Sequence, residues 1–75
     1  MKVSYDAKSD TLTVLFKDGA DVAISDDGRP GAILDYDVAG DLVAIEILDA
    51  SRRVSEATRV DFEVIGSLPR EGGAR

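Results

Sequence analysis

The segment GAILDYDVAGDLVAIEILDAS, residues 31–51, contains two strand patterns around which the rest of the chain can be placed. Residues 32–36 and 42–48 are rich in aliphatic side chains, and the Asp and Gly residues of 37–41 favour a turn between them. The run 42–48 is almost continuously apolar, which is typical of a strand covered on both faces. We therefore predict a hairpin. Its predicted pairs are Tyr36 with Asp41, Leu34 with Val43, and Ala32 with Ile45.

A second hairpin is predicted at the N-terminus. Val3 and Tyr5 alternate with polar residues, as do Leu12 and Val14, and the Asp and Ser residues of 6–10 favour a turn. Pairing Tyr5 with Leu12 and Val3 with Val14 places all four apolar side chains on one face of the sheet.

A third strand is predicted over 20–25, after a loop formed by residues 17–19 with Gly19 in the left-handed conformation. The alternation of apolar residues sets its register against the preceding strand. The predicted pairs are Phe16 with Ala20, Val14 with Val22, and Leu12 with Ile24. Residues 26–31 contain two Gly and one Pro, and we expect them to be irregular.

The C-terminal third predicts a short helix over 50–58, capped by Asp49 or Ser51, and an edge strand over 60–64. The expected fold class is α+β: a mostly antiparallel β-meander of five to six strands with one short C-terminal helix. We expect residues 1–67 to form a single domain and residues 68–75 to form a flexible tail.

Composition excludes several kinds of chemistry. The 75 residues include no Cys and no His, which excludes disulfides, thiolate zinc sites and imidazole catalysis. Fifteen acidic residues against nine basic ones give a net charge of −6, which disfavours nucleic acid and anionic membranes as partners. The N-terminal residues lack the apolar region of a signal peptide, so we expect a cytoplasmic protein. No cofactor is predicted.

The pattern GxIxDYDxxGxLVxIEILDAS over 31–51, together with VSYD at 3–6 and DTLTV at 10–14, resembles the domain of unknown function 2283 family of small prokaryotic proteins. The resemblance covers about residues 2–53. It implies little about activity and transfers no catalytic or ligand residue. Some members look like the acidic half of a two-gene toxin–antitoxin-like pair, so the resemblance implies a small basic protein as one candidate partner.

Three acidic residues suggest two alternative functions. Asp35, Asp37 and Glu46 have the spacing of a calcium loop around Gly40, which would make the chain a divalent-metal-binding module. However, Ala39 stands where the fifth position needs a ligand, and strands flank the loop where that motif has helices. We therefore predict a hairpin turn and no metal site.

Glu46 beside Asp35 would also suit a carboxylate-based hydrolase with two different carboxyl pKa values. The simpler interpretation is a Glu46 side chain that is partly exposed, or paired with Arg52 or Arg53. Because no other residue resembles a nucleophile, we predict that the protein is not an enzyme.

The favoured prediction is a small self-associating protein-interaction domain. The predicted register collects apolar residues on the sheet face opposite to Val3 and Val14, and one short helix cannot cover both faces. We therefore expect a homodimer, and the alternative is that residues 60–65 fold back over this face within one chain. The predicted interaction surface of the homodimer is Leu15, Ile33, Leu42 and Leu48.

Overall fold

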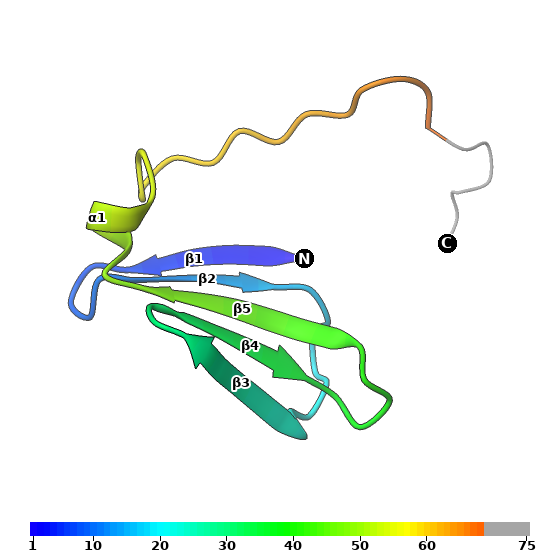
Figure 1. Cartoon of the computed structure of the whole chain (residues 1–75). Helices are drawn as coiled ribbons and strands as arrows, with labels where there is room; N and C mark the ends of the chain where they lie inside the picture. The colour runs from blue at the N-terminus through cyan, green and yellow to red at the C-terminus, as the bar shows by residue number, and fades with distance from the viewer. Residues whose placement is uncertain (69–75) are drawn as a thin grey trace.

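The computed structural model describes residues 1–68 and contains one open antiparallel sheet with a single short helix at one end (Figure 1). The elements are β1 (Lys2–Asp6), β2 (Thr11–Leu15), β3 (Ile24–Arg29), β4 (Ala32–Tyr36), β5 (Leu42–Leu48) and α1 (Ala50–Arg53). The strand order is β1-β2-β5-β4-β3. The predicted fold class is confirmed. The predicted tail, apart from Leu68, lies outside the described residues.

The N-terminal hairpin has the predicted register, with Val3 opposite Val14 and Tyr5 opposite Leu12. The turn between these strands is closed by the Asp6 side chain, whose Oδ1 accepts the backbone N–H of Lys8 at 2.9 Å. This is the local role that Asp is expected to play in a turn.

The β4–β5 hairpin has the predicted strand bounds but a different register. Leu34 pairs with Ile45 and Ala32 with Ile47, two residues further along β5 than predicted, and an irregularity lies between Asp35 and Tyr36. The turn accounts for the shift, because Asp37 donates its N–H to the Asp41 carbonyl at 2.9 Å. A shift by two residues leaves Leu34 and Ala32 on the predicted face.

The predicted pairing of 20–25 with β2 is wrong. β2 pairs with β5 instead, and β3 begins only at Ile24 and pairs with β4. The most apolar strand, β5, thereby gains a neighbour on each side at the centre of the sheet. Gly19 does adopt a positive φ of 76°, but within a longer connection that passes the ends of β5 and β4. Residues 26–29, expected to be irregular, belong to edge strand β3, which contains a break in register.

The C-terminal elements are shorter than predicted. The helix ends at Arg53 because Val54 is extended, and Asp49, at the N-cap position, makes no capping bond with its side chain. Residues 60–64 form no strand, and the chain from 60 to 68 runs out along the helix side of the sheet (Figure 1). No helix in residues 1–68 is long and apolar enough to cross a membrane.

The core of this single-layered fold is thin. Among the described residues, Val43, Ala44 and Ala50 are the buried apolar side chains, with exposed fractions of 1%, 5% and 0%. The radius of gyration is 14.4 Å, against about 11 Å for a compact domain of this length. The accessible surface of 5798 Å² is about 30% larger than that of a compact 8.0 kDa protein. The chain is therefore less compact than a domain of this length, and apolar side chains such as Phe16, Ile24 and Phe62 stay exposed at 39%, 62% and 78%.

Candidate interaction surface

One face of the sheet consists of apolar side chains in two rows that cross β1, β2, β5 and β4. Side chains on neighbouring strands that lie opposite one another pack together, so these rows form a continuous surface. We call this surface the apolar face. Its members are Val3, Val14, Ile45 and Leu34 in the first row, and Tyr5, Leu12, Ile47 and Ala32 in the second. All eight are partly exposed, because the helix covers only one end of the sheet.

The cover at that end is fixed by polar contacts. The Asp10 carboxylate accepts the Tyr5 hydroxyl at 2.6 Å, the Ser51 N–H at 2.9 Å and the Ser51 hydroxyl at 2.7 Å. The hydrogen bond from Tyr5, followed by those from Ser51, lowers the pKa of Asp10, and the same contact raises the pKa of Tyr5. Asp10 therefore ties the first turn of the sheet to the helix.

Sequence reasoning missed this anchor, although one signal was available. The signal is an Asp at the end of the predicted turn, because Asp is one of the few residues that readily adopt a left-handed conformation. In the structure Asp10 has a φ of 54°. The carbonyl of Asp10 also accepts the N–H of Ala50 at 2.9 Å.

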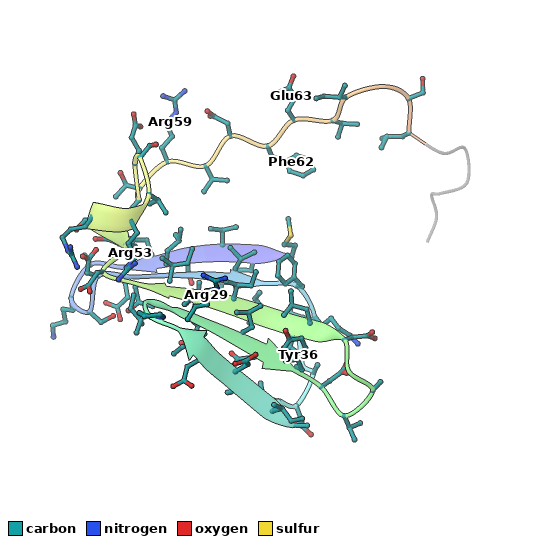
Figure 2. The ribbon with its side chains drawn as sticks, in the orientation of Figure 1. Arg29, Tyr36, Arg53, Arg59, Phe62 and Glu63 are labelled. Carbon is teal, nitrogen blue, oxygen red and sulfur yellow. The ribbon has the colours of Figure 1, made fainter. Side chains whose placement is uncertain are left out.

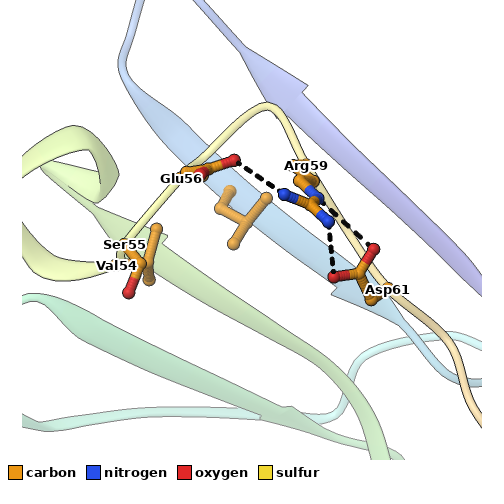
Figure 3. Close-up of a pocket in the computed structure, with 6 residues that line it drawn as sticks. Val54, Ser55, Glu56, Arg59 and Asp61 are labelled. Atoms are coloured by element: carbon orange, nitrogen blue, oxygen red, sulfur yellow. Dashed lines mark hydrogen bonds and ion pairs between the residues drawn. The ribbon is translucent and has the colours of Figure 1, made fainter.

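Beyond the helix, the chain lies over Leu12 and forms a depression of about 320 Å³ (Figure 3). Its other lining residues are Val54, Ser55, Glu56, Arg59 and Asp61. Arg59 pairs with Asp61 at 3.3 Å and with Glu56 at 3.8 Å. These contacts hold together the turn from which the chain leaves the sheet.

The opposite face mixes apolar and polar side chains, and we call it the mixed face. One row contains Thr13, Glu46 and Ile33, and the next contains Leu15, Ala44, Asp35 and Ser25. The predicted surface residues Leu15 and Ile33 are therefore on the mixed face, and both are half-buried. Leu48 is 37% exposed near the end of β5, and Leu42 lies at the irregular pair with Tyr36.

At the centre of the mixed face the structure brings Asp35 and Glu46 together. Asp35 is only 7% exposed and accepts the Ser25 hydroxyl at 2.6 Å. A hydrogen bond with Asp35, together with burial and repulsion between the two carboxylates, raises the pKa of Glu46. Glu46 is partly exposed, as expected, and Arg52 pairs with Asp49 at 3.3 Å instead.

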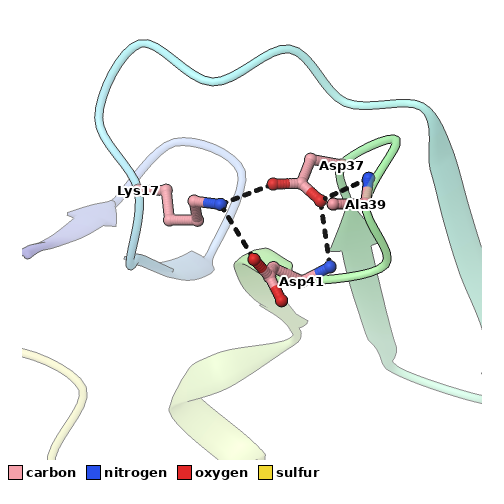
Figure 4. Close-up of polar contacts among 4 residues, drawn as sticks. All are labelled: Lys17, Asp37, Ala39 and Asp41. Atoms are coloured by element: carbon pink, nitrogen blue, oxygen red, sulfur yellow. Dashed lines mark hydrogen bonds and ion pairs between the residues drawn. The ribbon is translucent and has the colours of Figure 1, made fainter.

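Asp37 is separated from this pair and belongs to a clamp at the β4–β5 turn (Figure 4). Its Oδ1 accepts the N–H groups of Ala39 at 3.0 Å and Asp41 at 2.9 Å, while its Oδ2 binds Lys17 Nζ at 2.6 Å. The hydrogen bond with Lys17 lowers the pKa of Asp37 and raises that of Lys17. The predicted turn is confirmed, and both carboxylate oxygens of Asp37 hold it in place.

The three predicted acidic residues therefore do not converge on one point. Asp35 and Glu46 meet on the mixed face, whereas Asp37 stabilises a turn. No group of three or more His, Cys, Asp or Glu residues within 1–68 is arranged to hold a metal ion.

Comparison with known proteins agrees with the resemblance found in the sequence. A family model described as "Protein of unknown function (DUF2283)" matches residues 2–51, which comprise all five strands and the start of the helix. No curated protein and no solved structure matches the chain. Because the family model covers about two-thirds of the sequence, the chain belongs to the DUF2283 family of proteins of unknown function.

Proposed function

We propose that the protein is a self-associating protein-interaction domain, in which two copies pack their apolar faces together. The observation that carries this proposal is the apolar face itself, which crosses four strands and whose eight side chains all stay partly exposed in the single chain. Burial of aliphatic side chains is the main source of stability in small domains. A second copy would supply the layer that this sheet lacks.

The large exposed surface of the protein supports a dimer. The protein exposes roughly 1,300 Å² more than a compact chain of its mass, an excess to which both the single-layered sheet and the extended C-terminal segment contribute, and each partner in a stable interface buries about 800 Å². In a two-fold dimer the same surface of each copy forms the interface, and such dimers are the commonest closed assemblies. The cytoplasmic location and the small basic partner stay predictions.

The mixed face is a weaker candidate for this interface. Burying its centre would remove the remaining water from Glu46, whose carboxyl group lies beside the already buried Asp35. The four strands that carry the apolar face place no carboxylate in its two rows, and on edge strand β3 the next positions of these rows are Asp26 and Arg29. We therefore assign the self-association to the apolar face rather than to the predicted surface around Leu15 and Ile33.

Two adjacent residues of β4 test the proposal. Leu34 and Ile33 are similar in size and both half-buried, but they point to opposite faces. We expect Leu34→Lys to convert a dimer of twice 8.0 kDa into a monomer in light scattering, while Ile33→Lys leaves the dimer intact. Circular dichroism checks that both variants keep their strands. A wild-type mass of 8.0 kDa at micromolar concentration would refute the dimer, and dissociation by Ile33→Lys alone would place the interface on the mixed face.

A further inference from the structure

The C-terminal arm, residues 60–68, has the pattern of a strand but no strand partner within the described chain. Val60, Phe62 and Val64 occupy alternate positions and are 58%, 78% and 49% exposed. In Figure 2 the Phe62 ring points toward the sheet and the Glu63 side chain points away from it. The extended residues 60–65 span about 20 Å, the length of an ordinary strand, before Gly66 turns the chain with a φ of 88°. The arm is therefore long enough, and patterned correctly, to add a strand to a sheet.

The sheet offers two free edges, and they differ in character. β3 carries Asp26, Asp27 and Arg29 and contains a break in register, features that discourage strand addition. β1 is regular over five residues and pairs on its inner side with β2. Its outer backbone groups have no strand neighbour in the sheet. β1 is therefore the edge suited to receive another strand.

We infer that the C-terminal arm of one copy pairs antiparallel with β1 of a second copy, with Phe62 opposite Val3. This inference rests on the proposed self-association and adds the element that the two copies exchange. The register follows from placing apolar side chains opposite apolar ones and acidic side chains opposite basic ones. The pairs are Val60 with Tyr5, Asp61 with Ser4, Phe62 with Val3, Glu63 with Lys2, and Val64 with Met1.

Each part of this register is chemically complementary. Phe62 and Val60 extend the two rows of the apolar face by one strand, because Val3 and Tyr5 begin those rows. On the other face, Glu63 meets Lys2, and the Asp61 carboxylate meets a Ser4 hydroxyl that can donate to it. A register shifted by one residue would place Glu63 against Val3 and lose both matches.

The arm points to a second copy because it forms no strand with its own sheet in the single chain. The turn before it is fixed by the Arg59 pairs with Asp61 and Glu56, and its depression lies over Leu12 of β2 rather than beyond β1. From there the arm runs free on the helix side, back toward the end at which β1 begins (Figure 1). A second sheet packed on the apolar face lies about 10 Å away on that side. We therefore expect the edge of that second sheet to lie within reach of the arm.

A disulfide scan tests the exchange directly, because the native chain has no cysteine. In the double variant Lys2→Cys/Glu63→Cys, the two Cα atoms would lie about 5 Å apart, within the range for a disulfide. After incubation with oxidised glutathione, which is reduced as the protein disulfide forms, we expect a non-reducing gel to show covalent dimers at twice 8.0 kDa. The matched control, Ser4→Cys/Glu63→Cys, is two residues out of register, at about 8 Å, and should stay unlinked.

A charge exchange tests the same pair without oxidation. We expect Lys2→Glu and Glu63→Lys each to raise the dimer dissociation constant about three- to tenfold, and the double exchange to restore it. Both residues are exposed in the single chain, so neither change should affect its folding. A double variant as weak as the single ones would contradict the register.

The outcomes separate this inference from the proposed function. A wild-type dimer in light scattering whose Lys2→Cys/Glu63→Cys variant does not cross-link would keep the self-association and overturn the exchange. An internal disulfide in a chain of 8.0 kDa would show that the arm pairs with its own β1, which also overturns it. A wild-type monomer would refute the proposed function.

Discussion

The two faces of the sheet come from the same five strands but differ in what they require from their surroundings. The apolar face presents two rows of aliphatic and aromatic side chains and needs a covering layer. The mixed face places Thr13, Glu46 and Asp35 among its apolar residues, and Asp35 finds a partner in Ser25 on the neighbouring strand. Because its polar side chains form hydrogen bonds within the face or with water, the mixed face can stay exposed without a covering layer.

This difference shows that apolar content alone does not identify an interface. Leu15 and Ile33 on the mixed face are as apolar as Leu12 and Leu34 on the other. What distinguishes their positions is the pair of carboxylates beside them. Removing water from such a pair costs free energy, whereas removing it from an all-apolar row gains free energy.

The largest expected effect comes from making the same substitution on each face. Ile45→Ala removes the centre of a four-strand row, and we expect it to cost about 3 kcal/mol of unfolding free energy in the assembled protein. Ile33→Ala, on the mixed face, should cost about 1 kcal/mol because much of that side chain keeps contact with water. Urea denaturation at matched protein concentrations measures both. Equal losses would abolish the distinction between the faces.

A smaller, pH-dependent effect is expected at the carboxylate pair. The folded protein raises the pKa of Glu46, so the stability that this group contributes is fully present below its ordinary pKa of 4.5. That contribution is lost as the pH rises through the higher folded-state value. We therefore expect Glu46→Gln to raise the melting temperature at pH 7 and to change it little near pH 4.

The control for this measurement is Asp18→Asn, which removes one negative charge from an exposed loop. Because both variants change the net charge equally, their difference isolates the interaction with Asp35. A Glu46→Gln protein less stable than the wild type at pH 7 would show that the charged form of Glu46 is favoured by the fold.

The smallest effect is expected for Thr13→Val, in the row beside Glu46. Thr and Val are both β-branched and suit a strand, so the unfolding free energy should change by no more than about 0.5 kcal/mol. Light scattering should give the same mass as for the wild type. A new, larger assembly would mean that the mixed face is also close to forming an interface.

Local sequence pattern predicted β1, β2, β4 and β5 well, because each strand alternates or is continuously apolar next to a turn of Asp and Gly. The pairing of β2 was not predictable in this way. Residues 20–25 alternate as well, but β5 competes for the same edge of β2 and has more apolar surface to bury. The two competing segments lie far apart in the sequence, so their competition cannot be predicted by matching the register of neighbouring strands.

The candidate site was predictable to a similar degree. The proximity of Asp35 and Glu46 follows from the hairpin, because even a two-residue error in register keeps both side chains on the same face. The anchor made by Asp10 depends on a helix that is 40 residues away in the sequence, and the solitary arm depends on where the helix ends. Both are consequences of tertiary structure.

The irregular, charged edge of β3 has a consequence for the growth of larger aggregates. A sheet protein polymerises into fibres when each added copy presents a fresh edge to the next. Here Asp26 and Asp27 lie on that edge, and the break in register before Arg29 bends it out of line. An incoming strand would have to bring its backbone against like charges from this acidic chain. We therefore expect growth from the β3 side to be unfavourable, so that the proposed self-association would give a small closed assembly rather than a fibre.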